Sequence, residues 1–307
     1  MLTVHILTKN NSKTIRKTLD CVQWADKILI ADLGSTDDTL KICEEFDTRI
    51  FNMSCPRNEA RNKLIEMTSG PTFYIEPWEA LAKGHESLNN ISGTTKATII
   101  QNKTLIKEIR AWIDKPKFIN PVYETINEKN SKNSDILIYS TGRSDYDDML
   151  SEINKWKKTF PLDTAPYYYE ACTLLSMGDW KKFLYSSEYY MFLEKSQSIS
   201  STMNHYYYAM VQLMHVKKVK PTLQNLAICL SAKPLMAEFW CLAGDVHYHL
   251  VKNFSVAKEL YENAILLGSK RLNNDDWPMD ISKYKSYPTK MIESCNKLME
   301  SKSLYVV

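Results

Sequence analysis

Short apolar runs alternate with polar segments over the first quarter of the chain. The runs cover residues 2–7, 27–32, 49–51 and 72–75. Between the first two, Ile15, Leu19 and Val22 recur at the spacing of one helix face. Strands that alternate with helices in this way favour a parallel sheet, so the sequence predicts an α/β domain.

The second apolar run ends in Asp32, and a helix start follows it. Ser35 with Asp38 three residues later has the pattern of a capping box, which predicts a helix over 39–46. Asp32 is therefore expected at the tip of a buried strand, where open α/β sheets bind nucleotides. The alternative is that Asp32 only organises the turn.

The second half of the chain repeats itself. Matching residues stand 34 positions apart, in the pairs Tyr206/Trp240, Ala209/Ala243, Leu223/Ala257, Ala227/Tyr261, Leu230/Ala264 and Pro234/Gly268. This period, with small and aromatic residues between paired helices, is typical of tetratricopeptide repeats. We therefore predict an α/β domain over 1–146 and an all-α repeat domain over 147–307.

Length, charge and composition limit the number of domains, the kinds of partner and the cell compartment. The length of 307 residues suffices for two domains, and the net charge of +3 is too small to demand a nucleic-acid or membrane partner. No apolar run approaches the ~20 residues of a membrane span, and seven cysteines without metal-ligand spacing suit a reducing compartment. With 8 glycines beside abundant Lys, Asn and Ile, these features predict a cytoplasmic protein of a bacterium or phage-infected bacterium.

The order of motifs resembles family-2 glycosyltransferases of the GT-A fold over residues 1–145. The resemblance is carried by Thr-Lys-Asn at 8–10, Asp-x-Gly-Ser-Thr-Asp at 32–37 and Ala-Arg-Asn at 60–62. It implies a Rossmann-like, mainly parallel sheet and an enzyme that uses a nucleotide-diphosphate sugar as co-substrate. The implied nucleotide-sugar contacts are Thr8, Lys9, Asn10, Asp32 and Arg61.

The metal-binding motif of the family is altered. Glu76-Pro77-Trp78-Glu79 stands where the family has Asp-x-Asp-Glu, and Trp78 cannot ligate a hard cation through oxygen. We predict no metal ligands, with the diphosphate neutralised by cations drawn from Lys9, Arg57, Arg61, Arg110 and Lys115. Mg²⁺ or Mn²⁺ held through Glu76 is the alternative. Trp78 either stacks on the sugar or base, or fills the core.

A candidate catalytic base follows from the same resemblance. Residues 118–126 match the family's aromatic-x-x-x-Val-His-Glu-x-Leu, with Tyr123 in place of the His. Glu124 is thereby implied as the base that takes the acceptor proton in an inverting displacement. Asp114 and Glu128 are alternative bases, and Glu76 and Arg110 are expected near the diphosphate.

Three functions remain open at this level. The first is sugar transfer to a macromolecular acceptor, either a protein or peptide side chain or a modified base in phage-type DNA, which would be flipped out of the duplex. The second is an inactive pseudo-glycosyltransferase that acts in binding or assembly through its repeats. The third is a nucleotide-sugar-binding regulator. Tyr-rich repeats predict a contact face for the acceptor or for a homo-oligomer, and no membrane partner is expected.

Overall fold

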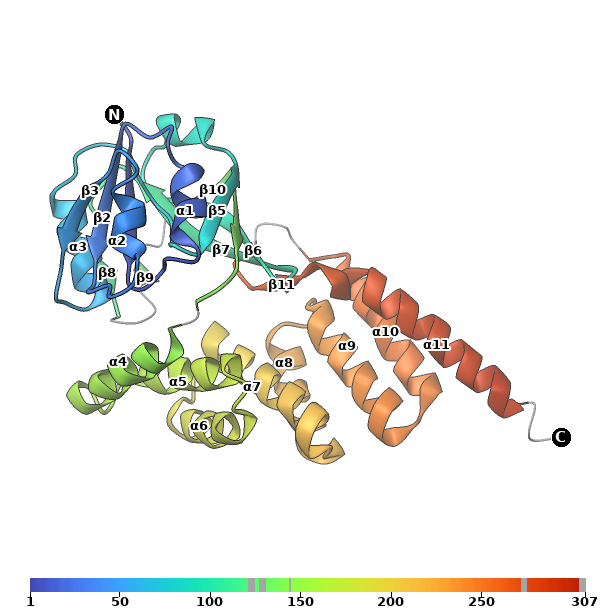
Figure 1. Ribbon diagram of the computed structural model, residues 1–307. Helices are drawn as coiled ribbons and strands as arrows, with labels where there is room; N and C mark the ends of the chain where they lie inside the picture. The colour runs from blue at the N-terminus through green and yellow to red at the C-terminus, as the bar shows by residue number, and fades with distance from the viewer. Residues whose placement is uncertain (121–124, 127–130, 144, 272–274, 304–307) are drawn as a thin grey trace. The chain divides into compact units, whose positions relative to one another are not determined.

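The computed structural model describes residues 1–120, 125–126, 131–143, 145–271 and 275–303 (Figure 1). The chain forms two compact units, Met1–Glu152 and Ile153–Val307. The division falls inside helix α4 (Tyr146–Thr159), six residues after the 146/147 boundary expected from the sequence. In the part of the chain that the structure describes, every helix is too short or too polar to cross a bilayer.

The N-terminal unit is built on one mixed sheet. Its strands are β1 (Thr3–Thr8), β2 (Lys27–Asp32), β3 (Arg49–Asn52), β4 (Thr72–Tyr74), β5 (Glu79–Lys83), β6 (Thr95–Gln101), β7 (Thr104–Trp112) and β10 (Lys132–Ser140). Their order is β3-β2-β1-β4-β7-β6-β10-β5. β3, β2, β1 and β4 are parallel, β10 is parallel to β6, and the β4–β7, β6–β7 and β10–β5 pairs are antiparallel. This arrangement confirms the predicted α/β fold class.

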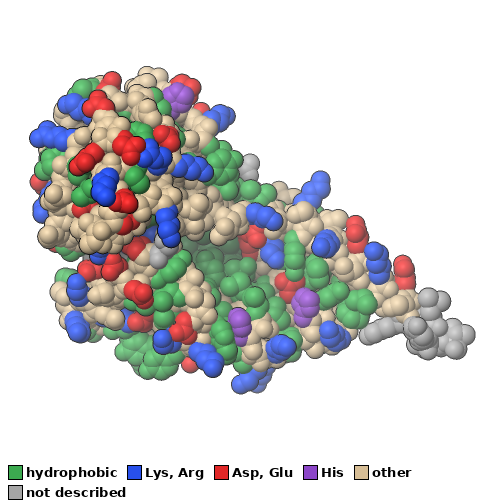
Figure 2. All heavy atoms as spheres, in the orientation of Figure 1, with side chains coloured by type: hydrophobic (Ala, Val, Ile, Leu, Met, Phe, Trp, Pro, Cys, Tyr) green, Lys and Arg blue, Asp and Glu red, His purple; other side chains and the backbone are tan. Residues whose placement is uncertain are grey.

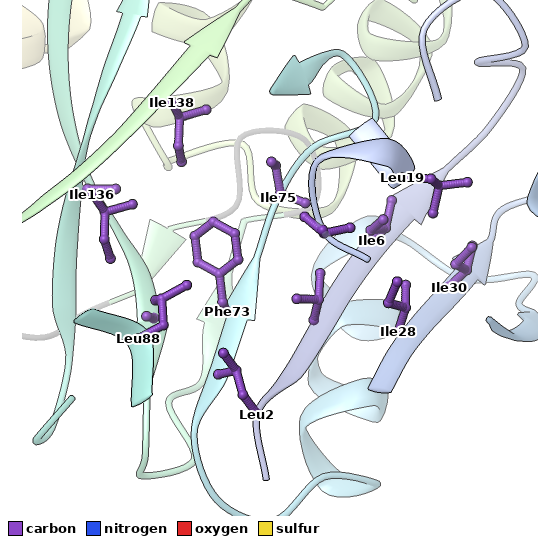
Figure 3. Packing of buried hydrophobic residues seen from close by; sticks show 14 of the residues in the cluster. Leu2, Ile6, Leu19, Ile28, Ile30, Phe73, Ile75, Leu88, Ile136 and Ile138 are labelled. Carbon is purple, nitrogen blue, oxygen red and sulfur yellow. The ribbon is translucent and has the colours of Figure 1, made fainter. Parts of the chain in front are cut away.

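The apolar runs form the core of this sheet. Figure 3 shows Ile6, Ile28, Ile30 and Phe73 from neighbouring parallel strands packed together, with Leu19 of helix α1 (Ile15–Asp20) among them. Every residue of β1 is buried, as expected for a central parallel strand. A small second sheet pairs β8 (Phe118–Ile119) with β9 (Thr125–Ile126).

Two predictions about the helix after β2 were wrong, namely its end at residue 46 and its capping box. Helix α2 spans Thr39–Cys43, and Asp38 at its N-cap directs its carboxylate to Lys41, while Ser35 donates to Asp32, so the capping box is not formed. Helix α3 spans Arg57–Glu66. A 3₁₀ turn, η1 (Glu86–Asn90), follows β5.

The C-terminal unit consists of antiparallel helix pairs. They are α5 (Ala165–Ser176) with α6 (Trp180–Leu193), α7 (Ile199–Val211) with α8 (Val219–Ala232), and α9 (Ala237–Val246) with α10 (Phe254–Gly268), followed by 3₁₀ turn η4 (Ile281–Tyr284) and α11 (Ser286–Ser303). A two-residue strand, β11 (Met279–Asp280), precedes η4. Helical repeats are thus confirmed for this half of the chain.

Small residues at the repeat positions let these helices pack closely. Ala209 and Ala243 are buried at equivalent places in α7 and α9. Beside Ala243, a Cβ on Gly244 would lie 2.6 Å from the Tyr261 ring of α10, so only glycine allows this contact. Helices α7 and α9 each lead into a π-helical turn, η2 (Gln212–Val216) and η3 (His247–Val251) respectively. The same local architecture therefore recurs in these two repeats.

Candidate active site

The carboxyl ends of β2, β1 and β4 meet at one edge of the sheet. β1 pairs with both neighbours in parallel, and its last residue, Thr8, stands opposite Asp32. Glu76 follows β4 closely. The sequence-predicted residues Thr8, Asp32 and Glu76 are therefore brought to the same edge, which is where open α/β sheets bind ligands.

Asp32 organises the turn that follows its strand. Its buried carboxylate accepts hydrogen bonds from the Gly34 nitrogen (3.1 Å), the Ser35 nitrogen (3.1 Å) and the Ser35 hydroxyl (2.5 Å). Gly34 has a φ of 93°, a left-handed conformation that glycine adopts without strain. The turn interpretation of Asp32 thus has direct geometric support.

The loops after β1 and β2 are tied together. Asn10, with a left-handed φ of 53°, donates its main-chain N–H to the Ser35 hydroxyl (3.0 Å) and accepts from the Thr36 nitrogen (2.7 Å). Lys9 forms an ion pair with Asp148 (2.5 Å) at the start of α4. The segment 8–10 and the turn after Asp32 therefore form one preorganised surface.

Glu76 lies at the centre of a buried ion network. Its Oε2 accepts from Arg57 Nη2 and its Oε1 from Arg61 Nη2, each at 2.7 Å. Burial alone would raise the pKa of Glu76, but the two guanidinium groups lower it to about 2. Glu76 is therefore ionised, and both of its oxygens are engaged by arginine.

Glu79 extends this network to β7. Arg110 Nη1 and Nη2 donate to Glu79 Oε2 and Oε1, each at 2.9 Å, and the Glu76 nitrogen also donates to Oε2 (2.9 Å). Burial raises the pKa of Glu79 to about 7. Arg110 in addition donates to Glu108 (2.9 Å), so it bridges a buried and a partly exposed carboxylate.

The Tyr74 ring contacts two of the buried arginines, Arg61 and Arg110. The Cζ atoms of Arg61 and Arg110 lie 4.1 and 4.4 Å from the centre of its ring, within cation–π range. Burial raises the pKa of the Tyr74 hydroxyl well above its usual value. The ring thereby fixes the positions of both guanidinium groups.

Trp78 is half-buried, and two further arginines lie beside its ring. The Arg57 and Arg143 Cζ atoms lie 5.7 and 5.8 Å from the centre of a Trp78 ring. Arg143 forms a bidentate pair with Asp145, with both bonds at 2.7 Å. The Trp78 carbonyl accepts from the Thr141 nitrogen and hydroxyl, each at 3.1 Å, which joins the end of β10 to this centre.

One sequence-predicted residue, Lys115, stands apart from this cluster. Lys115 donates to the Glu66 carbonyl at the far end of α3 from Arg57, so it does not join the cations expected around the diphosphate. Glu124 and Glu128 lie outside the described residues. Over the described ranges, no group of three His, Cys, Asp or Glu side chains gathers as a metal site would require.

Two residues of this centre, Tyr74 and Arg143, were not predicted from the sequence. Tyr74 reads as an ordinary core aromatic of its strand, because Arg61 and Arg110 are remote from it in sequence. Arg143 was missed although it stands three residues after Ser140, where β10 ends. A basic residue directly after a strand that ends at this edge was the available signal.

One family model matches the N-terminal part of the chain. Residues 3–75 match the family model described as Glycosyl transferase family 2. No curated protein sequence matches the chain.

Solved structures of helical-repeat proteins resemble the C-terminal half. A fragment of MamA from Desulfovibrio magneticus RS-1 is 18% identical, with 52% of this chain and 88% of that chain covered and a TM-score of 0.38. A tetratricopeptide repeat protein from Parabacteroides merdae is 11% identical, with 51% and 56% covered and a TM-score of 0.40. Over residues 3–75 the chain is similar to glycosyl transferase family 2.

Proposed function

We propose that this chain is a glycosyltransferase that moves a sugar from a nucleotide-diphosphate sugar to a macromolecular acceptor. One observation carries the proposal. The strands β1, β2 and β4 lie within the family-2 match, and their carboxyl ends bring Asp32, Glu76 and the cations around Glu76 to one edge. A nucleotide sugar needs both a nucleoside site and positive charge for its diphosphate, and this edge offers residues for each.

In this proposal the nucleoside binds at the loops after β1 and β2. Asn10, Ser35 and Thr36 join these loops by hydrogen bonds, so their main-chain groups are already ordered before a ligand arrives. Preorganisation of this kind reduces the entropy lost on binding. Thr8, Lys9 and Asp32 complete the proposed nucleoside surface.

The proposed reaction is a single inverting displacement. The acceptor oxygen forms a bond to the anomeric carbon while the bond from that carbon to the diphosphate oxygen breaks. Glu124 takes the acceptor proton, and the nucleoside diphosphate leaves with the electron pair. The role of Glu124 rests on its sequence motif alone.

The repeat unit is proposed to present the acceptor. Stacked tetratricopeptide helices offer grooves that bind extended segments, which favours a protein or peptide side chain as the acceptor. A modified DNA base is the other macromolecular candidate. The net charge of +3 gives little attraction to phosphates, so the protein acceptor is preferred.

A non-catalytic binding protein is the second candidate function. It is favoured by Asp32, whose carboxylate is engaged by its own turn, and by Trp78 in place of a metal ligand. Release of nucleoside diphosphate from a panel of nucleotide sugars separates the two. Turnover supports the transferase, whereas binding without turnover supports the second candidate.

A further inference from the structure

The acidic groups after β4 are poor ligands for a divalent metal. The fold family implies Mg²⁺ or Mn²⁺ at this position, and such ions need oxygen atoms with accessible lone pairs. Both oxygens of Glu76 and both of Glu79 already accept from guanidinium groups at 2.7–2.9 Å. A metal bound to these oxygens would lie against Arg57, Arg61 and Arg110 and be repelled. Among the described residues, the donor set does not fit the metal.

We propose that this centre instead binds the diphosphate of the nucleotide sugar through Arg57 and Arg143, without a divalent metal. The inference rests on the proposed function and names the groups that replace the metal. Arginine suits this task because its planar guanidinium offers five N–H donors and matches phosphate geometry. Such a group can keep its carboxylate partner while it donates to a ligand.

Exposure distinguishes these two arginines from the other two. The side chains of Arg61 and Arg110 are 1% and 4% exposed, and the Tyr74 ring lies against both. Arg57 and Arg143 are 10% and 14% exposed and lie beside the half-buried Trp78. A diphosphate that arrives at this edge therefore reaches Arg57 and Arg143 first.

Glu76 and Trp78 act as positioning residues in this centre. Glu76 joins Arg57 to the buried Arg61, and the Trp78 ring centre lies within 6 Å of both proposed ligand-binding arginines. The tryptophan that stands in place of the family's metal-binding aspartate thus positions the two arginines. It holds two cations at the place where the family holds one metal ion.

Calorimetric titration with nucleoside diphosphates tests the proposal on the full chain. Binding of at least one of them is expected to be equally tight in EDTA and in Mn²⁺. Arg143→Gln removes charge-assisted hydrogen bonds and is expected to weaken this binding roughly ten- to hundredfold. The control Arg16→Gln, which removes the exposed ion pair with Glu45, is expected to leave binding unchanged.

The other possible results of this titration distinguish the arginine proposal from the transferase proposal. Binding that needs Mn²⁺, or that Arg143→Gln leaves intact, would overturn the arginine proposal and spare the transferase. If no nucleoside diphosphate binds under either condition, the transferase proposal fails together with it. Circular dichroism of Arg143→Gln identifies a folding defect, and Arg143→Lys, which keeps the charge, is then expected to retain part of the affinity.

A separate observation concerns the outer surface of α6. Tyr185, Tyr189 and Phe192 follow one another at helical spacing on one side of this helix and are 76%, 44% and 70% exposed. Phe160 and Leu162 before α5 are also exposed, and a hydrogen bond from Thr164 to Glu194 holds their loop at the end of α6. We call these five side chains the α6 face. Figure 2 shows hydrophobic side chains gathered at the place of α6.

We propose that the α6 face pairs with the α6 face of a second copy of this chain. At about 200 Å² for each fully exposed large side chain, it offers roughly 690 Å², close to the ~800 Å² that each partner of a stable complex buries. An antiparallel pair of α6 helices places Tyr185 opposite Phe192 and Tyr189 near the two-fold axis. The face is thus complementary to itself, as a symmetric dimer requires.

Light scattering over a concentration series tests this pairing. The wild-type chain is expected to form a dimer, and Phe192→Glu is expected to raise the dissociation constant at least tenfold by placing a charge in the interface. Leu266→Glu is the matched control, since Leu266 on α10 is 58% exposed and lies outside the α6 face. A wild-type monomer throughout, or a dimer that Phe192→Glu leaves intact, would overturn the proposal.

Discussion

Replacing Glu76 by glutamine is expected to lower the free energy of unfolding by about 3–5 kcal/mol, although the substitution keeps the size of the side chain. The glutamine leaves Arg61, whose side chain is 1% exposed, and Arg57 without the charge that each now contacts at 2.7 Å. Urea denaturation of the full chain, followed by circular dichroism, measures the loss in the transition of the N-terminal unit.

The matched control is Glu45→Gln in the same unit. Glu45 pairs with Arg16 at 2.6 Å on the surface, and exposed pairs contribute only about 0–1 kcal/mol. Similar losses for both variants would show that the Glu76 network does not stabilise the fold in the way described.

The difference in unfolding free energy between wild type and Glu76→Gln is expected to depend on pH. The pKa of Glu76 in the folded chain is about 2, against a usual value of 4.5. A lowered carboxyl pKa stabilises the folded state fully above the unfolded value and loses that effect as the pH falls through the folded value. The stability difference between wild type and Glu76→Gln is therefore expected to shrink between pH 5 and pH 2.

Replacing Glu124 by glutamine is expected to reduce the turnover number by about 10²–10⁴-fold, the usual contribution of a general base. The amide cannot take the acceptor proton, whereas the donor contacts proposed at the loops after β1 and β2 remain. Single-turnover kinetics together with donor titration separate the two steps, and donor affinity is expected to stay unchanged.

Glu128→Gln serves as the control for this assignment. Both acids stand in the same segment, so both variants remove one negative charge from it. Loss of turnover in Glu128→Gln with normal turnover in Glu124→Gln would transfer the role of base to Glu128.

The sequence predicted the elements whose signals are local. The apolar run at 27–32 coincides with β2, because a parallel strand buried on both faces is apolar throughout. The 34-residue period placed Ala209 and Ala243 at equivalent buried positions, since repeated packing imposes repeated small residues. The family resemblance implied that Asp32 contacts the nucleotide sugar and that Glu76 lies near its diphosphate, and the structure brings both residues to one sheet edge.

Features that depend on distant partners could not be predicted in this way. The buried face of α3 includes Arg57 and Arg61, which Glu76 neutralises, so apolar periodicity does not show where this helix begins. Ser35 does not cap α2, since Asp38 stands at the N-cap and the Ser35 hydroxyl oxygen accepts from the Asn10 nitrogen. The contacts from Glu76 and from Asn10 come from other segments of the chain, which no local pattern contains.

Release of nucleoside diphosphate from a panel of nucleotide sugars, assayed by chromatography in parallel with EDTA and with Mn²⁺, tests the central claim most directly. The claim is that the edge formed by β1, β2 and β4 activates a nucleotide sugar without a metal. We predict release from at least one donor, slow without an acceptor and at the same rate in both conditions. No release from any donor in either condition would contradict the transferase, and release only with Mn²⁺ would contradict its metal independence.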